Sequence, residues 1–258
     1  MSDDPIVSEK EVFEQAGAGL VAWLTLAAQN SNAPLPVQGA MAMAGSLVGL
    51  GFGRSVFRAA QRRFPKFARG FLSGLDPDPV RAGQKAKAMA EQGVTESLDD
   101  IMMRAFRQMM DAVDDSVVPV LGHMVGLYRL EGKRANHFFR AFGRLLCDLE
   151  PGELDDLQRV LVLAQRQSNN RDALYLEIDQ AGKVWASIHN TTGQAFDQSV
   201  SHAFRIFGLL KREQLATNVT AGAPRYGTAN PAAEVTMSMS HTVVAEMVRM
   251  LMLPAGAT

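Results

Sequence analysis

The chain has 258 residues, a formal net charge of −1, 47% apolar residues and 21% charged residues. This composition excludes a disordered chain, a collagen and a globally basic nucleic-acid-binding protein. The single cysteine, Cys147, excludes an internal disulfide. The first residues are acidic and lack the basic start and apolar run of a secretory signal, so we expect a cytoplasmic protein.

The N-terminal segment is predicted to form an apolar helical hairpin. Residues 15–53 contain no charged side chain, and a polar turn at 29–36 divides them into two apolar arms. Each arm is shorter than the roughly 20 residues that span a bilayer. Gly45, Gly49 and Gly53 recur every four residues and predict a helix face that packs closely against a partner or a second copy of the chain. Two interpretations stay open: a buried soluble hairpin, and a hairpin inserted in a membrane or lying on it.

A basic helix is expected to follow the hairpin, within a first domain of residues 1–75. Several of its cations share one helix face, and Pro65 is expected to end or kink the helix. An anionic leaflet attracts a basic helix beside an apolar hairpin, so the predicted partner is a membrane surface or an acidic protein. The alternative is a solvated face. The predicted membrane-binding or partner-binding residues are Gly45, Gly49, Gly53, Arg54, Arg58, Arg62, Arg63, Lys66 and Arg69.

A helical bundle is predicted for residues 80–168. The Asp-Pro-Asp-Pro run at 76–79 favours a break in the chain and places the first domain boundary there. Pro151 and Glu153 suit the first turn of the last bundle helix. Apolar residues at helical spacing predict helices at about 80–92, 101–113, 117–130, 134–149 and 151–167.

The last domain, residues 172–258, is predicted to contain strands as well as helices. Apolar residues alternate through 174–188 and predict a β-hairpin. A helix at 196–212, two strands at 215–220 and 235–240, and a closing helix at 243–253 complete the predicted order, which resembles half of a winged helix. The predicted fold class is therefore α+β, predominantly α, with a helical hairpin, a helical bundle and a small antiparallel sheet.

No cofactor, metal or catalytic site is predicted. Gly17-Ala-Gly19-Leu-Val-Ala22 matches a dinucleotide-binding fingerprint, but residues 9–15 before it are polar and helical rather than a strand. None of the five histidines is paired with another at the i+3 or i+4 spacing of helix-borne metal ligands. Cys147 lies among leucines and is interpreted as inert core. An enzyme with a non-local active site stays open as an alternative.

Three segments of the chain resemble the Abi-alpha (abortive-infection) family of bacterial proteins. They are Val118-Pro-Val-Leu, Phe138-Phe-Arg-Ala-Phe-Gly-Arg-Leu-Leu and Leu149-Glu-Pro-Gly-Glu-Leu, between a helical N-terminus and a winged-helix-like end. The resemblance implies a role in phage defence or host interaction.

With the charge pattern, this resemblance predicts a non-enzymatic interaction or regulatory protein. Such a protein would act through its apolar and basic N-terminal segment, on an acidic partner or peripherally at the inner face of the membrane. The alternative is a winged-helix regulator that binds DNA. Its expected recognition helix carries Asp197, His202 and Arg205 rather than a basic face, so a nucleic-acid partner is not expected.

Overall fold

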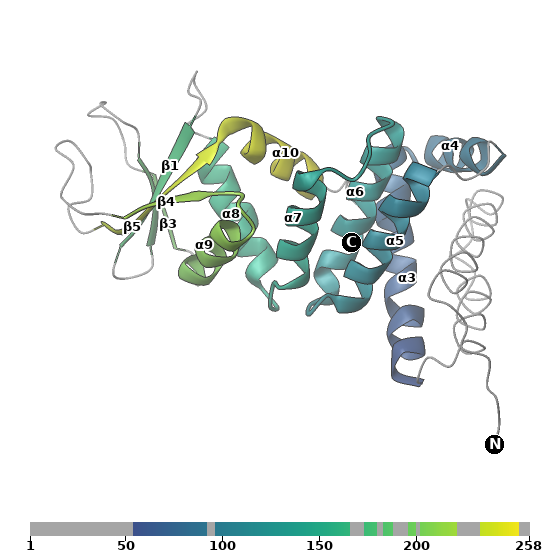
Figure 1. The fold of residues 1–258 in the computed structure, drawn as a ribbon, viewed down its shortest axis with the longest axis horizontal. Coiled ribbons are helices and arrows are strands. Elements are labelled where there is room, and N and C mark those ends of the chain that lie inside the picture. Colours follow the sequence, from purple (N-terminus) through teal and green to yellow (C-terminus); the bar gives the residue numbers. More distant parts are fainter. Residues whose placement is uncertain are drawn as a thin grey trace. The chain divides into compact units, whose positions relative to one another are not determined.

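The computed structural model describes residues 54–91, 96–165, 173–179, 183–187, 196–199, 202–220 and 233–252. These residues are predominantly helical, as predicted, and they also form a five-stranded antiparallel sheet (Figure 1). The predicted N-terminal hairpin, with Gly45, Gly49 and Gly53, lies outside the described residues. The chain forms two compact units, which meet in sequence between Asn136 and His137.

The first unit is built around one buried helix. Every residue from Val117 to Gly126 is buried, and α3 packs lengthwise along this segment. α3 is amphipathic, because its buried side chains recur at helical spacing: Phe64, Phe67, Phe71 and Leu75. The described elements are α3 (Arg54–Leu75), α4 (Pro79–Glu91), α5 (Glu96–Asp111), the 3-10 helix η1 (Asp115–Val117) and α6 (Val118–Leu130).

α3 continues through Pro65, so of the two expected outcomes, an end or a kink, the end of the helix is wrong. A proline inside a helix removes one backbone N–H donor and disfavours the helix at that point. Here the buried side chains on both sides of Pro65, Phe64 and Phe67, anchor the helix in the core. This packing keeps the chain helical where the local pattern favours a break.

Four glycines bring the backbones of α3 and α6 into direct contact. Gly70 and Gly74 lie one turn apart on α3, and Gly122 and Gly126 lie one turn apart on α6. A Cβ atom at Gly74 would lie 2.9 Å from the Cα of Gly126, and one at Gly122 would lie 2.8 Å from the backbone nitrogen of Phe71. At all four positions the added atom would lie closer still to a carbonyl oxygen of the other helix. None of these positions can hold a side chain without moving one of the helices.

The Asp-Pro-Asp-Pro run is the turn between α3 and α4 rather than a boundary between domains. Asp78 caps α4, because its Oδ1 accepts the backbone N–H of Val80 at 2.8 Å. Lys85 donates to Asp76 Oδ2 and to the carbonyl oxygen of Leu75, both at 2.9 Å. The hydrogen bond from Lys85, together with one from the backbone of Asp78, holds the pKa of Asp76 below its ordinary value.

The second unit combines a helical layer with the sheet. Its elements are α7 (His137–Cys147), α8 (Glu153–Gln165), β1 (Ala173–Asp179), β2 (Lys183–Ser187), β3 (Phe196–Ser199), α9 (Ala203–Arg212), β4 (Thr217–Thr220), β5 (Ala233–Ser240) and α10 (His241–Leu251). The predicted division into 1–75, 80–168 and 172–258 is corrected to two units, because α3 belongs with α6 and α8 belongs with the sheet.

The strand order in the sheet is β3-β2-β1-β5-β4, and every neighbouring pair is antiparallel. β1 and β2 form the predicted hairpin. Alternate residues of the central strands are buried, and α8 packs against β1, β2 and β3. This face of the sheet therefore contributes to the core of the second unit, through Leu176, Ile178, Val184, Met237 and Met239.

The predicted helix at 196–212 is wrong in its first part. Phe196–Ser199 is strand β3, and α9 begins only at Ala203. β3 forms because it pairs with β2, a contact between distant residues that the local pattern does not reveal. β4 and β5 pair with each other, and β5 also pairs with β1, so both belong to the larger sheet. The winged-helix resemblance stays a prediction.

Candidate functional site

The predicted binding residues on α3 lie in different settings. For Arg54 and Arg58 the structure describes only the backbone, within the first turns of α3. Arg62, Lys66 and Arg69 are spaced by four and three residues, so they share one side of the helix. We call these three residues the cationic face of α3.

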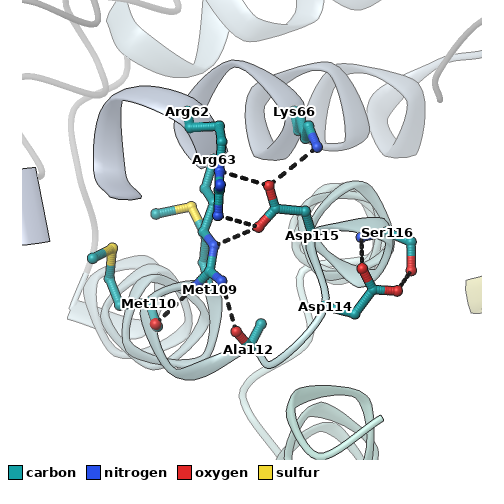
Figure 2. A network of polar contacts seen from close by, with 9 residues as sticks. All are labelled: Arg62, Arg63, Lys66, Met109, Met110, Ala112, Asp114, Asp115 and Ser116. Carbon is teal, nitrogen blue, oxygen red and sulfur yellow. Dashed lines mark hydrogen bonds and ion pairs between the residues drawn. The ribbon is translucent and has the colours of Figure 1, made fainter. Parts of the chain in front are cut away.

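Arg63 is a buried capping residue rather than a surface cation, which corrects its predicted role. It is only 8% exposed. Its Nε donates to Asp115 Oδ1 at 2.8 Å, and its terminal nitrogens donate to the carbonyl oxygens of Met109 (2.9 Å), Met110 (2.8 Å) and Ala112 (2.7 Å) (Figure 2). Carbonyl groups at a helix C-terminus lack backbone donors. The guanidinium supplies those donors and fastens the end of α5 to α3.

Asp115 is the centre of the cluster that Figure 2 shows. Its Oδ2 lies 2.8 Å from Arg62 Nε and 3.3 Å from Lys66 Nζ, while its Oδ1 binds Arg63. Burial raises the pKa of Asp115, but hydrogen bonds from Arg63 and Lys66 outweigh this effect and hold the pKa below its ordinary value. The carboxylate is therefore charged at neutral pH, and three cations contact it.

The cationic face remains open to solvent although two of its members contact Asp115. The side chain of Arg62 is 63% exposed and that of Lys66 is 40% exposed. Arg69 is exposed, and it has no ion-pair partner among the residues that the structure describes. Arg62, Arg63 and Lys66 share the single carboxylate of Asp115. Together with Asp115, these three cations therefore carry an excess of two positive charges.

Asp115 is the member of this cluster that the sequence pattern did not reveal. The local signal is Asp114-Asp115-Ser116 before an apolar helix, which is typical of helix caps. Asp114 does cap η1, since its Oδ1 accepts the backbone N–H of Ser116 at 3.1 Å. Nothing in this pattern shows that the next carboxylate binds cations some fifty residues earlier in the chain.

Two of the three basic residues of α9 are paired within the second unit. Arg205 on α9 lies 3.1 Å from Glu153 and donates to the carbonyl oxygen of Asp148 at 2.7 Å. Arg212 pairs with Asp148 and with Glu213, and the hydrogen bonds that it donates to these carboxylates raise the pKa of Arg212. Such pairs reduce the positive charge that a DNA-binding helix directs to phosphates.

Two histidines are held by neighbouring polar groups. Asp156 Oδ2 accepts the backbone N–H of His202 at 3.1 Å and lies 3.0 Å from its Nδ1, so this carboxylate caps α9. His123 is buried, and its Nδ1 lies 2.9 Å from the hydroxyl of Ser73. That hydroxyl donates to the carbonyl oxygen of Gly70 at 2.7 Å. The Ser73–His123 contact is thus part of the packed α3–α6 interface.

The described residues contain no group of histidine, cysteine, aspartate or glutamate that could hold a metal ion. Within the same ranges, no helix is long and apolar enough to cross a membrane. No family model, curated protein or solved structure matches the chain.

Proposed function

We propose that this chain is a non-enzymatic interaction protein whose cationic α3 face binds an anionic membrane surface or an acidic partner. The proposal rests on one observation: Arg62, Lys66 and Arg69 are exposed on one side of a helix whose other side is buried. A positive face of this kind attracts anionic surfaces at long range, and the attraction weakens as salt screens it.

The biological setting in this proposal is bacterial host defence, which follows from the resemblance to the Abi-alpha family. A cytoplasmic protein, located peripherally at the inner face of the membrane, would encounter anionic lipids there. Self-association through the glycines at 45–53 belongs to the same proposal.

The winged-helix reading is the weaker alternative. A recognition helix needs free cations, whereas Arg205 and Arg212 on α9 are paired with carboxylates of the second unit. The enzyme reading has less support still. The serine–histidine contact at Ser73 and His123 is part-buried at the α3–α6 interface, where His123 itself is buried.

The test is co-sedimentation of the full chain with vesicles that contain phosphatidylserine. The double variant Arg62→Gln/Arg69→Gln removes two cations from the face and keeps Arg63, which the fold requires. Each basic residue near an anionic surface contributes about 1 kcal/mol. Losing two should therefore weaken binding by about thirtyfold, and added salt should weaken the wild-type protein in the same direction.

The matched control is Arg134→Gln/Lys211→Gln, which removes the same charge from two exposed positions elsewhere. It should bind like the wild type. If both double variants lose affinity equally, general charge rather than the α3 face drives the binding. If the wild-type protein fails to bind at low salt, the membrane form of the proposal is wrong, and an acidic protein partner becomes the remaining form.

A further inference from the structure

We propose that the cationic face of α3 selects a phosphomonoester over anions of lower charge. This inference rests on the proposed binding function, and it names the chemistry of the ligand. The group recognised is a doubly charged phosphoryl group, carried either by a lipid headgroup or by a small soluble molecule.

The local balance of charge at α3 favours a doubly charged ligand. Arg62, Arg63 and Lys66 contact the single carboxylate of Asp115, which leaves two positive charges uncompensated within this group. Asp114, the neighbouring acid, is turned toward Ser116 rather than toward α3 (Figure 2). A phosphomonoester carries about −1.5 to −2 charges at neutral pH, which matches this excess better than a single negative charge does.

The side chains of Arg62 and Lys66 are already positioned for binding. Arg62 Nε and Lys66 Nζ contact the same oxygen of Asp115, at 2.8 and 3.3 Å. The two cationic centres are therefore close enough for one phosphoryl group to contact both. Because Asp115 holds both side chains, a ligand does not have to immobilise them, and this lowers the entropic cost of binding.

Arg62 and Lys66 also keep N–H donors that Asp115 does not use. Arg62 uses Nε and Nη2 on the carboxylate, at 2.8 and 3.1 Å, so within the described part of the chain its Nη1 has no partner. Its side chain is 63% exposed, so this edge can reach a ligand. Lys66 uses one of its three N–H groups in the contact with Asp115. Planar guanidinium groups suit phosphate oxygens, and a phosphomonoester offers three acceptor oxygens to these donors.

The experiment compares three ligands with the full chain. Two are phosphatidylcholine vesicles that contain either phosphatidylserine or phosphatidic acid, adjusted to equal zeta potential. The third is inorganic phosphate, measured against sodium chloride of equal ionic strength by its effect on the melting temperature. We expect phosphatidic acid vesicles to bind about tenfold more tightly than phosphatidylserine vesicles, as one further charge-assisted hydrogen bond would produce.

The variant Arg62→Lys keeps the charge and removes the planar group. It should lose most of the preference for phosphatidic acid and retain its binding to phosphatidylserine vesicles. Arg134→Lys, the same exchange at an exposed position outside the face, is the matched control and should change neither value.

The outcomes separate this inference from the proposed function. Equal binding to both vesicles would overturn phosphomonoester selection and leave the proposed function intact. A rise in melting temperature with phosphate, without binding to either vesicle, would support a soluble phosphomonoester and contradict the membrane surface. If Arg62→Lys still preferred phosphatidic acid vesicles over phosphatidylserine vesicles, the role given to the guanidinium would be overturned. Binding to none of the three ligands would overturn the phosphomonoester inference and the membrane form of the proposed function, and would leave the acidic-partner form.

Discussion

Gly70→Ala should destabilise the first unit, while the same substitution at Gly208 should stabilise the second. A Cβ at Gly70 would lie 2.7 Å from the carbonyl carbon and 2.9 Å from the Cα of Pro119 on α6. Carbon atoms prefer separations of about 3.5–4.0 Å. Because the opposing atoms are backbone, no side-chain rotation can relieve the clash, and the helices must move apart.

The magnitude follows from two opposing effects. Alanine improves helix propensity over glycine by about 1 kcal/mol, but overpacking costs about 1–3 kcal/mol and occasionally more. We expect a net loss of about 2 kcal/mol for Gly70→Ala, since the clash lies at the backbone on both sides. Gly208 on α9 is exposed and has nothing within 4 Å of an added Cβ. Gly208→Ala should therefore gain about 0.5–1 kcal/mol from propensity alone.

Urea unfolding followed by hydrogen exchange would measure both effects. Peptides that cover α3 and α6 should lose protection in Gly70→Ala, and peptides that cover α9 should gain it in Gly208→Ala. Two compact units can unfold separately, so local exchange is more informative than a single global midpoint. An unchanged or raised midpoint for Gly70→Ala, with α3 and α6 still protected, would show that the two backbones are not in contact.

Two further outcomes are expected. Arg63→Met should destabilise the first unit by about 3–5 kcal/mol, as expected when one partner of a buried, hydrogen-bonded charge is removed. Calorimetry should show that Arg63→Lys restores only part of the lost stability. If Arg63→Met lost less stability than the exposed Arg62→Gln, the capping role would be contradicted. Stability should also fall as the solution becomes acidic, because the pKa values of Asp115 and Asp76 are lower in the folded chain. A carboxylate of this kind contributes stability above its unfolded pKa of about 3.9 and loses the contribution as the pH falls through its folded value. The urea midpoint, measured from pH 6 downward, should fall once the pH is below about 4. Asp115→Asn should make the midpoint depend less steeply on pH. An equal pH dependence in the variant and the wild type would contradict the role of Asp115.

Features that depend on neighbouring residues were predictable from the sequence. The acidic first turn of α8 is an example, because Glu153 and its neighbours lie there as predicted, although the helix begins at Glu153 and Pro151 lies in the turn before it. The β1–β2 hairpin is another, since its alternating pattern and its register are both local. The amphipathic character of α3 was also readable from residue spacing.

Features that depend on distant residues were not predictable in the same way. The burial of Arg63 depends on carbonyl groups at and just after the end of α5, which lie more than forty residues away in the chain. Strand β3 forms because β2 offers it a partner, although the pattern at 196–199 favours a helix. In both cases a tertiary contact decides between local alternatives of similar energy.

The glycine spacing is an intermediate case. A four-residue repeat was interpreted as a close-packing face at Gly45, Gly49 and Gly53, and that prediction lies outside the described residues. The same repeat occurs at 70–74 and 122–126, where the structure shows backbone contact between α3 and α6. The signal was readable there too, but a repeat on one helix does not identify its partner helix.

The glycine contact between α3 and α6 also sets the order in which the first unit can fold during synthesis. A ribosome adds about 5–20 residues per second, so several seconds separate the synthesis of Gly74 from that of Gly126. Until α6 emerges, the Phe64, Phe67 and Phe71 side of α3 has no α6 to pack against. A nascent chain that pauses in this interval would present an aromatic helix to chaperones and to other nascent chains.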